Sequence, residues 1–175
     1  NGKLYFAAND GINGNELWVS DGGAVASGHT YMLADINTSS PSFASSSDPR
    51  EMTVMGSYIY FSANNGVVGR DLWVTDGISA VERMVTNFSS GNDPQNLTAC
   101  NGKLYYSADD GTNGREPWIS DGYPVGMGTH MLKDIHSKDS NPQEFTVVGT
   151  TVFFRAKQNG DGYELYKTNG TAAGT

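Results

Sequence analysis

The chain has very little of what would cross-link it covalently or hold it in a membrane. It contains one cysteine, Cys100, so no disulfide can form within the chain. Cys100 stands at an apolar position of a predicted strand, which indicates a buried structural thiol rather than a reactive one. No apolar run approaches the roughly 20 residues that a membrane-spanning helix needs, so we expect no membrane insertion.

Basic residues are also scarce. The 175 residues include 11 Lys and Arg against 19 Asp and Glu, which gives a formal net charge of −8. Binding to nucleic acid requires clustered cations, whereas the basic residues here are scattered, so we predict no nucleic-acid partner. An acidic surface is compatible with cations, with neutral ligands or with solubility alone.

Helix signals are the third absence. Capped apolar runs with a period of 3.6 residues are missing, while the chain holds 22 Gly, 9 Tyr and 7 Phe. Glycine-rich turns between aromatic strands are typical of all-β proteins. At this length one well-packed domain is expected. The sequence therefore predicts a single all-β domain.

What the chain does contain is a repeat. An acid, an apolar residue and an aromatic residue, followed closely by a small hydroxyl residue and Asp-Gly or Asn-Gly, recur four times. The copies are Glu16–Gly22, Asp71–Gly77, Glu116–Gly122 and Glu164–Gly170. Ten residues before each acid lies a strand aromatic, namely Phe6, Phe61, Tyr106 and Phe154. These aromatics follow one another after 55, 45 and 48 residues, which gives a period of about 49.

The repeat divides the single domain 1–175 into units of about 1–47, 48–92, 93–140 and 141–175. The two middle units begin with an X-Pro strand that the first unit lacks, and the last unit lacks its final strand. The expected strand counts are therefore three, four, four and three. A period of about 40 to 50 residues with four short strands is typical of propeller blades. We predict a β-propeller-like array of about four antiparallel blade units.

About four blades are few for a closed propeller. The ends could mate within the chain, two chains could complete a ring, or the chain could belong to a longer array. We favour a homo-oligomer or a larger parent. The chain opens within the pattern at Asn1-Gly2-Lys3, without an initiator Met or a signal peptide, as expected for a mature chain or a piece of a longer one.

These motifs resemble the ELWxxDGT tandem-repeat family of large bacterial extracellular and surface proteins, over nearly the whole chain. The family has no single established activity, so the resemblance implies an extracellular or cell-surface location and a repeat fold, but no reaction. The matching residues are Glu16-Leu17-Trp18 with Asp21-Gly22, Asp71-Leu72-Trp73 with Asp76-Gly77, Glu116 and Trp118 with Asp121-Gly122, and the trailing Gly128-Thr129 and Gly174-Thr175.

Two copies depart from the pattern. Pro117 occupies the Leu position of the third copy, and because proline lacks a ladder donor, this strand is expected at or near a sheet edge, or bulged there. The fourth unit has Tyr166 for Trp, Lys167 at an apolar position and Arg155 at a small-residue position. Charged residues at packing positions predict a terminal cap or a face that meets something other than a blade.

The repeated aromatics and acids form the first candidate site. Exposed aromatics would stack on sugar rings while carboxylates accept hydrogen bonds from sugar hydroxyls, and repetition would add avidity. Alternatively, the aromatic packs between blades and the acid binds the backbone of its hairpin. Packing alone requires a constant aromatic at one position, which favours the second interpretation. The residues are Trp18, Trp73, Trp118, Tyr166, Glu16, Asp71, Glu116 and Glu164.

The second candidate is a calcium site in the hairpin loops. Oxygen-bearing side chains close to a glycine resemble a calcium loop in kind, although the full Asp-x-Asp-x-Asp-Gly spacing is missing. The alternative is turn chemistry, in which Asx side chains bind their own backbone. Calcium is the one cofactor considered. The residues are Asn9, Asp10 and Asn13 in the first unit, and Asp109, Asp110 and Asn113 in the third.

Catalytic patterns are weak. The three histidines, His29, His130 and His136, have no zinc-ligand spacing, and no serine lies in a nucleophile elbow. Paired carboxylates recur in the units, whereas a catalytic pair should break the repeat. We therefore predict no enzyme. We expect a non-enzymatic extracellular binding module with lectin-like recognition of glycans or a cell-surface partner through repeated loop sites. The alternative is a structural or adhesive repeat, in one version stabilised by calcium, with no small-molecule activity.

Overall fold

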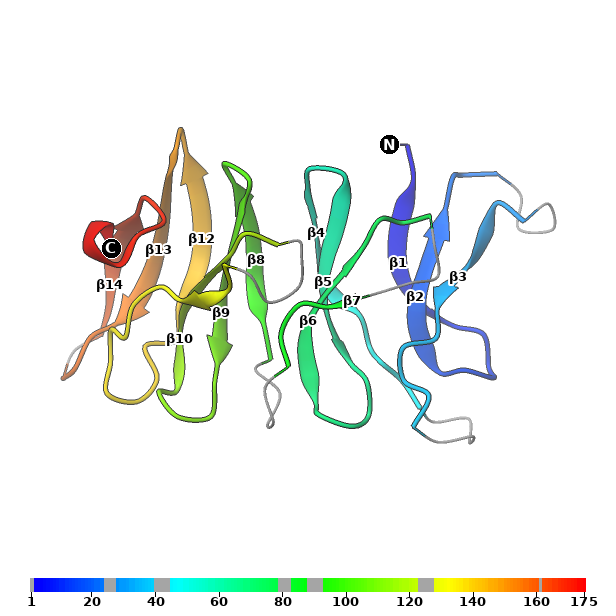
Figure 1. Ribbon diagram of the computed structural model, residues 1–175, viewed down its shortest axis with the longest axis horizontal. Helices are drawn as coiled ribbons and strands as arrows, with labels where there is room; N and C mark the ends of the chain where they lie inside the picture. The colour runs from blue at the N-terminus through cyan, green and yellow to red at the C-terminus, as the bar shows by residue number, and fades with distance from the viewer. Residues whose placement is uncertain are drawn as a thin grey trace.

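A computed structural model describes residues 2–23, 28–39, 45–78, 83–87, 93–122, 128–160 and 162–175. Four antiparallel sheets follow one another in chain order along the long axis, and the two termini lie at opposite ends of the row (Figure 1). The described residues do not close into a ring. The expected all-β class and the four antiparallel units are confirmed.

Each sheet contains consecutive strands. The first comprises β1 (Leu4–Asn9), β2 (Asn15–Ser20) and β3 (Thr30–Ala34). The second comprises β4 (Arg50–Met55), β5 (Tyr58–Asn64), β6 (Arg70–Thr75) and β7 (Arg83–Met84). The third comprises β8 (Gln95–Cys100), β9 (Lys103–Asp109), β10 (Arg115–Ser120) and β11 (His130–Met131). The fourth comprises β12 (Gln143–Val148), β13 (Thr151–Lys157) and β14 (Tyr163–Thr168), followed by the short 3₁₀ helix η2 (Ala172–Gly174). Among the described residues, the strand counts agree with those expected from the sequence.

The constant ten-residue step corresponds to a fixed hairpin. In every sheet the aromatic of one strand lies opposite the aromatic of the repeated motif on the next strand. Cross-strand partners point to the same face of a sheet, so each hairpin presents an aromatic pair on one face. The pairs are Phe6 with Trp18, Phe61 with Trp73, Tyr106 with Trp118, and Phe154 with Tyr166.

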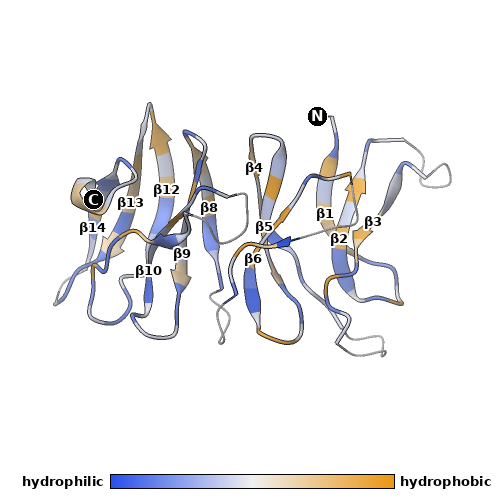
Figure 2. Cartoon of the chain, viewed as in Figure 1, coloured by the Kyte–Doolittle hydropathy of each residue, from blue (hydrophilic) through white to orange (hydrophobic). Residues whose placement is uncertain are grey.

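Successive sheets pack face to face, and the pairs of the second and third sheets lie in the junctions. Tyr60 and Leu72 of the second sheet lie in one apolar cluster with Tyr106 and Trp118 of the third. Equivalent clusters join the first sheet to the second and the third to the fourth. Apolar segments accordingly occur in strands of all four sheets (Figure 2). Because both faces of the two middle sheets are covered, β5 and β9 each contain five consecutive buried residues.

The strands that follow X-Pro lie side by side and link the sheets. Thr53 Oγ1 of β4 donates to the carbonyl of Leu97 in β8 (3.1 Å), and Thr98 Oγ1 of β8 donates to the carbonyl of Phe145 in β12 (3.4 Å). Each of these strands contains a register shift and a residue with positive φ, which marks a repeated β-bulge. The positive-φ residues are Glu51, Asn96 and Glu144. Within the described residues, the first sheet has no strand of this kind.

Pro117 lies on the strand next to a sheet edge, which is one of the expected alternatives. Strand β10 is paired with β9 on one side and with β11 on the other. The pairing with β11 ends beside Pro117, whose carbonyl accepts from the Leu132 amide (2.7 Å). In the second sheet, the amide of the equivalent Leu72 donates to the Thr86 hydroxyl instead of a backbone carbonyl (3.0 Å). The ladder therefore needs no backbone donor at this position, which explains why proline is tolerated.

Candidate functional site

The repeated acid is buried in three of its four copies. Glu16, Asp71 and Glu116 have 0% of their surface exposed, and Glu164 is exposed. The carboxylate of Glu116 accepts hydrogen bonds from the Ser140 amide (3.1 Å), the Ser140 hydroxyl (2.7 Å) and the Ile135 amide (2.9 Å). Burial raises the pKa of Glu116, and hydrogen bonds to the carboxylate offset only part of that effect.

The first unit repeats the arrangement. Glu16 accepts from the Ser47 amide (2.8 Å), the Ser47 hydroxyl (2.6 Å) and the Ile36 amide (2.9 Å), and burial raises its pKa as well. Ser47 and Ser140 each stand immediately before the X-Pro pair of the following sheet. The acid therefore ties down the segment that leads to the next sheet, a role that goes beyond holding its own hairpin. Asp71 Oδ1 accepts from the Thr86 hydroxyl (2.9 Å).

Two of the repeated aromatics, Trp73 and Trp118, belong to the packing between sheets. Trp118 is buried, while Trp18, Trp73 and Tyr166 are half-buried. The Trp73 indole donates to the Ala63 carbonyl (3.0 Å), and Tyr166 stacks on Phe154 with ring centroids 5.6 Å apart. The buried acids and Trp118 contact the protein itself, as the packing interpretation requires.

The predicted calcium loops are rigid turns. Asp10 Oδ1 accepts from the backbone amides of Ile12 and Asn13 (both 2.8 Å), and Oδ2 accepts from the Asn13 side chain (2.8 Å). Asn9 likewise accepts from the Gly11 amide (2.7 Å). The bond from the Asn13 amide is the largest of the effects that lower the pKa of Asp10.

The third unit repeats the same bonds with Asp109, Asp110 and Asn113. Burial raises the pKa of Asp110, but hydrogen bonds within the turn outweigh it and the net pKa is lowered. In the part of the chain that the structure describes, no three His, Cys, Asp or Glu residues are grouped so that they could hold a metal ion. The loops thus have the bonding that the turn interpretation predicts.

The hairpin loops lie along one edge of the row of sheets. The loops between β1 and β2, β5 and β6, and β9 and β10 all face the lower edge in Figure 1. Their tips expose Ile12, Val67 and Thr112. In the second loop, Asn65 accepts from the amides of Val67 and Val68 (both 3.0 Å), as Asp10 does in the first. The three loops therefore present similar rigid backbones in the same direction.

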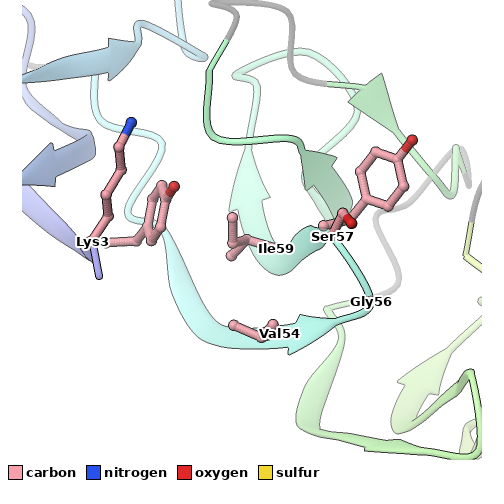
Figure 3. A pocket seen from close by; sticks show the side chains of 7 residues that line it. Lys3, Val54, Gly56, Ser57 and Ile59 are labelled. Atoms are coloured by element: carbon pink, nitrogen blue, oxygen red, sulfur yellow. The ribbon is translucent and has the colours of Figure 1, made fainter. Parts of the chain in front are cut away.

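A pocket opens where the first sheet meets the second. Lys3 and Tyr5, at the start of the first unit, line one side of it, and Figure 3 shows Lys3 apart from the labelled hairpin residues. Its hairpin side is formed by Val54, Gly56, Ser57, Tyr58 and Ile59. The pocket thus combines aromatic rings, an aliphatic floor, a hydroxyl and an ammonium group. Sequence reasoning did not single out these residues, although the missing X-Pro strand of the first unit is the signal that could have located them.

Comparison with known proteins identifies the fold alone. No family model and no curated protein matches the chain. A solved chain from a structural and mechanistic study of two prolyl endopeptidases is similar, with a TM-score of 0.60 and 11% sequence identity. The similarity covers 97% of this chain and 25% of that one, so this chain spans a quarter of that neighbour's length. Among the described residues, no helix has the length and hydrophobicity to span a bilayer.

Proposed function

We propose that the chain is a non-enzymatic, extracellular binding module. In this proposal the four sheets are blades of a propeller-like array related to the ELWxxDGT repeats. The hairpin loops recognise glycans or a cell-surface partner in a lectin-like manner. The observation that carries the proposal is the row of similar, exposed, rigid loops on one edge.

The loop chemistry supports this proposal. Turns already ordered by Asx hydrogen bonds lose little conformational entropy when they bind a ligand. The exposed Ile12 and Val67 offer apolar contacts for the C–H face of a sugar, and Asp10 keeps carboxylate lone pairs for hydroxyl donors. Weak sites repeated at fixed spacing gain avidity on a multivalent surface.

The three histidines make contacts within their own connecting segments. His29 Nδ1 lies 2.7 Å from the Asp21 carboxylate at the surface. His130 Nδ1 contacts the Gly128 carbonyl (3.2 Å), and His136 Nδ1 accepts from the Lys138 amide (2.9 Å). These are local turn contacts, in which a ring nitrogen orders its own loop.

The test compares variants at two ends of one strand. Val67 and Ile78 are both 79% exposed, on the loops before and after β6. We expect wild-type protein to bind a subset of a glycan array with inhibition by free sugar, and Ile12→Asp combined with Val67→Asp to abolish that binding. Ile78→Asp is the matched control and should bind like wild type. Equal binding by all three proteins would contradict the loop proposal.

The second candidate, a structural or adhesive repeat, is favoured by the fourth sheet. Leu165 is 77% exposed, although the equivalent Leu17, Leu72 and Pro117 are buried against the next sheet. A face of this kind suits assembly with a second copy or a longer array. Sedimentation should then show an oligomer that Leu165→Asp dissociates. A monomeric wild type would remove the support for self-association.

A further inference from the structure

Four segments of the chain have the pattern Asn-x-Ser/Thr, which is the acceptor sequence for N-linked glycosylation. They begin at Asn37, Asn87, Asn96 and Asn169. A folded acceptor must expose its carboxamide and leave the amide nitrogen unpaired, because this nitrogen forms the new bond. The sequon at Asn87 runs beyond the described residues, and the structure separates the other three by these two criteria.

Asn169 meets both criteria. Asn169 and Thr171 are exposed at the turn that follows β14. Asn169 Oδ1 accepts from the Thr171 hydroxyl (2.8 Å) and from the Thr171 amide (3.1 Å). Asn169 Nδ2 donates to no described residue. The turn therefore fixes the carboxamide through its oxygen and leaves its nitrogen available.

Asn37 forms the same local turn in a closed environment. Its Oδ1 accepts from the Ser39 hydroxyl (2.6 Å) and from the Ser39 amide (3.3 Å). However, Asn37 is only 7% exposed, and its Nδ2 donates to the Ser46 carbonyl (3.0 Å). The surrounding structure thus occupies the atom that would have to react.

Asn96 has a different geometry. It lies within β8, which pairs with β9, and has a φ of 58°. The hydroxyl of Thr98 donates to the carbonyls of Asn96 (3.2 Å) and Phe145 (3.4 Å) instead of the carboxamide. A transferase would have to pull β8 out of its sheet to reach this sequon.

The place of Asn169 in the repeat explains its exposure. The equivalent residues of the other units, Asp21, Asp76 and Asp121, are also exposed, although an outer strand follows each of them. Exposure is therefore a property of the turn after the motif strand. Only the fourth copy carries an amide here, and it lies at the end of β14 that is remote from the β13–β14 connection.

We propose that Asn169 is the acceptor of an N-linked glycan, transferred from a sugar whose anomeric carbon carries a nucleotide or lipid phosphate. Nδ2 attacks the anomeric carbon, and the bond from this carbon to the phosphate oxygen breaks. The electron pair leaves with the phosphate, and the Nδ2 proton passes to a base of the glycosyltransferase. The two hydrogen bonds to Oδ1 draw electron density from the amide, which makes the Nδ2 proton more acidic.

The experiment offers both donors to the purified, folded chain. One reaction contains a soluble N-glycosyltransferase with UDP-glucose, and the other contains a single-subunit oligosaccharyltransferase with a lipid-linked sugar. Glycopeptide mass spectrometry measures the occupancy of each sequon relative to a free peptide of the same sequence. With at least one donor we expect about tenfold or more higher relative occupancy at Asn169 than at Asn37, where a hydrogen bond must break first.

Variants separate the sequon from its surroundings. Thr171→Ala should abolish the modification, and Thr171→Ser should retain it. A Cβ at Gly174 would lie 2.2 Å from Asn169 Oδ1 and 2.6 Å from Nδ2, so Gly174→Val leaves the sequon intact but displaces the carboxamide. We expect it to lower occupancy at least about threefold. Gly162→Val is the matched control, because a Cβ there has no atom within 4 Å, and it should be modified like wild type.

Two results would overturn the proposal. One is the absence of modification at Asn169 with either donor while the free peptide is modified. The other is equal relative occupancy at Asn37 and Asn169, which would show that the folded structure does not select the acceptor. Modification with one donor alone supports the proposal and identifies the phosphate carrier.

Discussion

The third and fourth sheets carry the same motif in different surroundings. Glu116 and Trp118 are buried between sheets, whereas Glu164 is exposed and Tyr166 is half-buried. The residue between them is buried as Pro117 in one copy and 77% exposed as Leu165 in the other. The acid and the residue after it are therefore buried only where another sheet follows the motif.

The fourth sheet also carries its arginine on a different strand of the hairpin. In the third sheet Arg115 donates to the Ser107 carbonyl (3.2 Å) and hydroxyl (3.1 Å) on the adjacent strand. In the fourth, Arg155 occupies the Ser107 position, donates to Gln143 (2.7 Å) and lies 4.6 Å from the ring centre of Tyr163, which occupies the Arg115 position. In both sheets a guanidinium therefore contacts across the same two positions of the hairpin, but the arginine lies on the second strand in the third sheet and on the first strand in the fourth. In the fourth sheet this contact lies on a face that no sheet covers within the described residues.

The largest difference between the two sheets should come from the aromatic. Trp118→Ala should lower the free energy of unfolding by about 3–5 kcal/mol, because it leaves a cavity between two sheets. Tyr166→Ala should cost about 1–2 kcal/mol, since this side chain is only partly buried. Urea denaturation measures both. Equal costs would contradict the difference in burial between the two aromatics.

The acid should give the next largest difference. Glu116→Ala removes the acceptor for several buried donors and should cost about 2–3 kcal/mol. Glu164→Ala is expected to stay within about 0.5 kcal/mol of wild type, as usual for an exposed side chain. Thermal unfolding of the two variants provides the comparison, and a destabilised Glu164→Ala would break it.

The strand aromatic offers a smaller, stabilising change. Tyr106 is buried, and its hydroxyl has no hydrogen-bond partner among the described residues. Burial raises the pKa of this phenol, and the nearby Asp71 raises it further. Tyr106→Phe should increase the free energy of unfolding by about 1 kcal/mol, because Phe is the residue at the other three positions. Loss of stability would show that the hydroxyl is satisfied in solution.

The pH dependence of stability should be smaller still. Because burial raises the pKa of Glu116 in the folded state, the folded protein binds the proton more tightly than the unfolded chain. This contribution is fully present below the ordinary carboxyl pKa of about 4.3 and is lost as pH rises through the raised value. Glu116→Gln should remove this part of the stability–pH curve, measured by denaturation in a pH series.

The smallest expected effect concerns calcium. The carboxylate oxygens of Asp10 and Asp110 already accept bonds within their turns. We therefore expect a chelator to change the melting temperature by less than about 1 °C in scanning calorimetry. A clear drop that added calcium reverses would restore the metal interpretation of these loops.

Much of the fold could be predicted because the repeat is local. The ten-residue step from Phe6 to Glu16 and its counterparts specifies a hairpin, and the strand counts follow from the units. Pro117 lies near a sheet edge as expected, and the structure adds that a side chain accepts the amide hydrogen bond at the equivalent position of the second sheet. The sequence could not show whether the Trp and acid set faced solvent, since identical motifs occur in buried and exposed copies.

The sequence by itself determined the local structure of this protein. Asx turns, aromatic hairpins and their period depend on residues close together in the chain, and they recur wherever the motif recurs. Only the tertiary structure decided which copies are buried, where the acids bind and where the pocket lies. Those properties depend on whether a sheet or a strand is present alongside, and burial is a relation between segments that no single motif can specify.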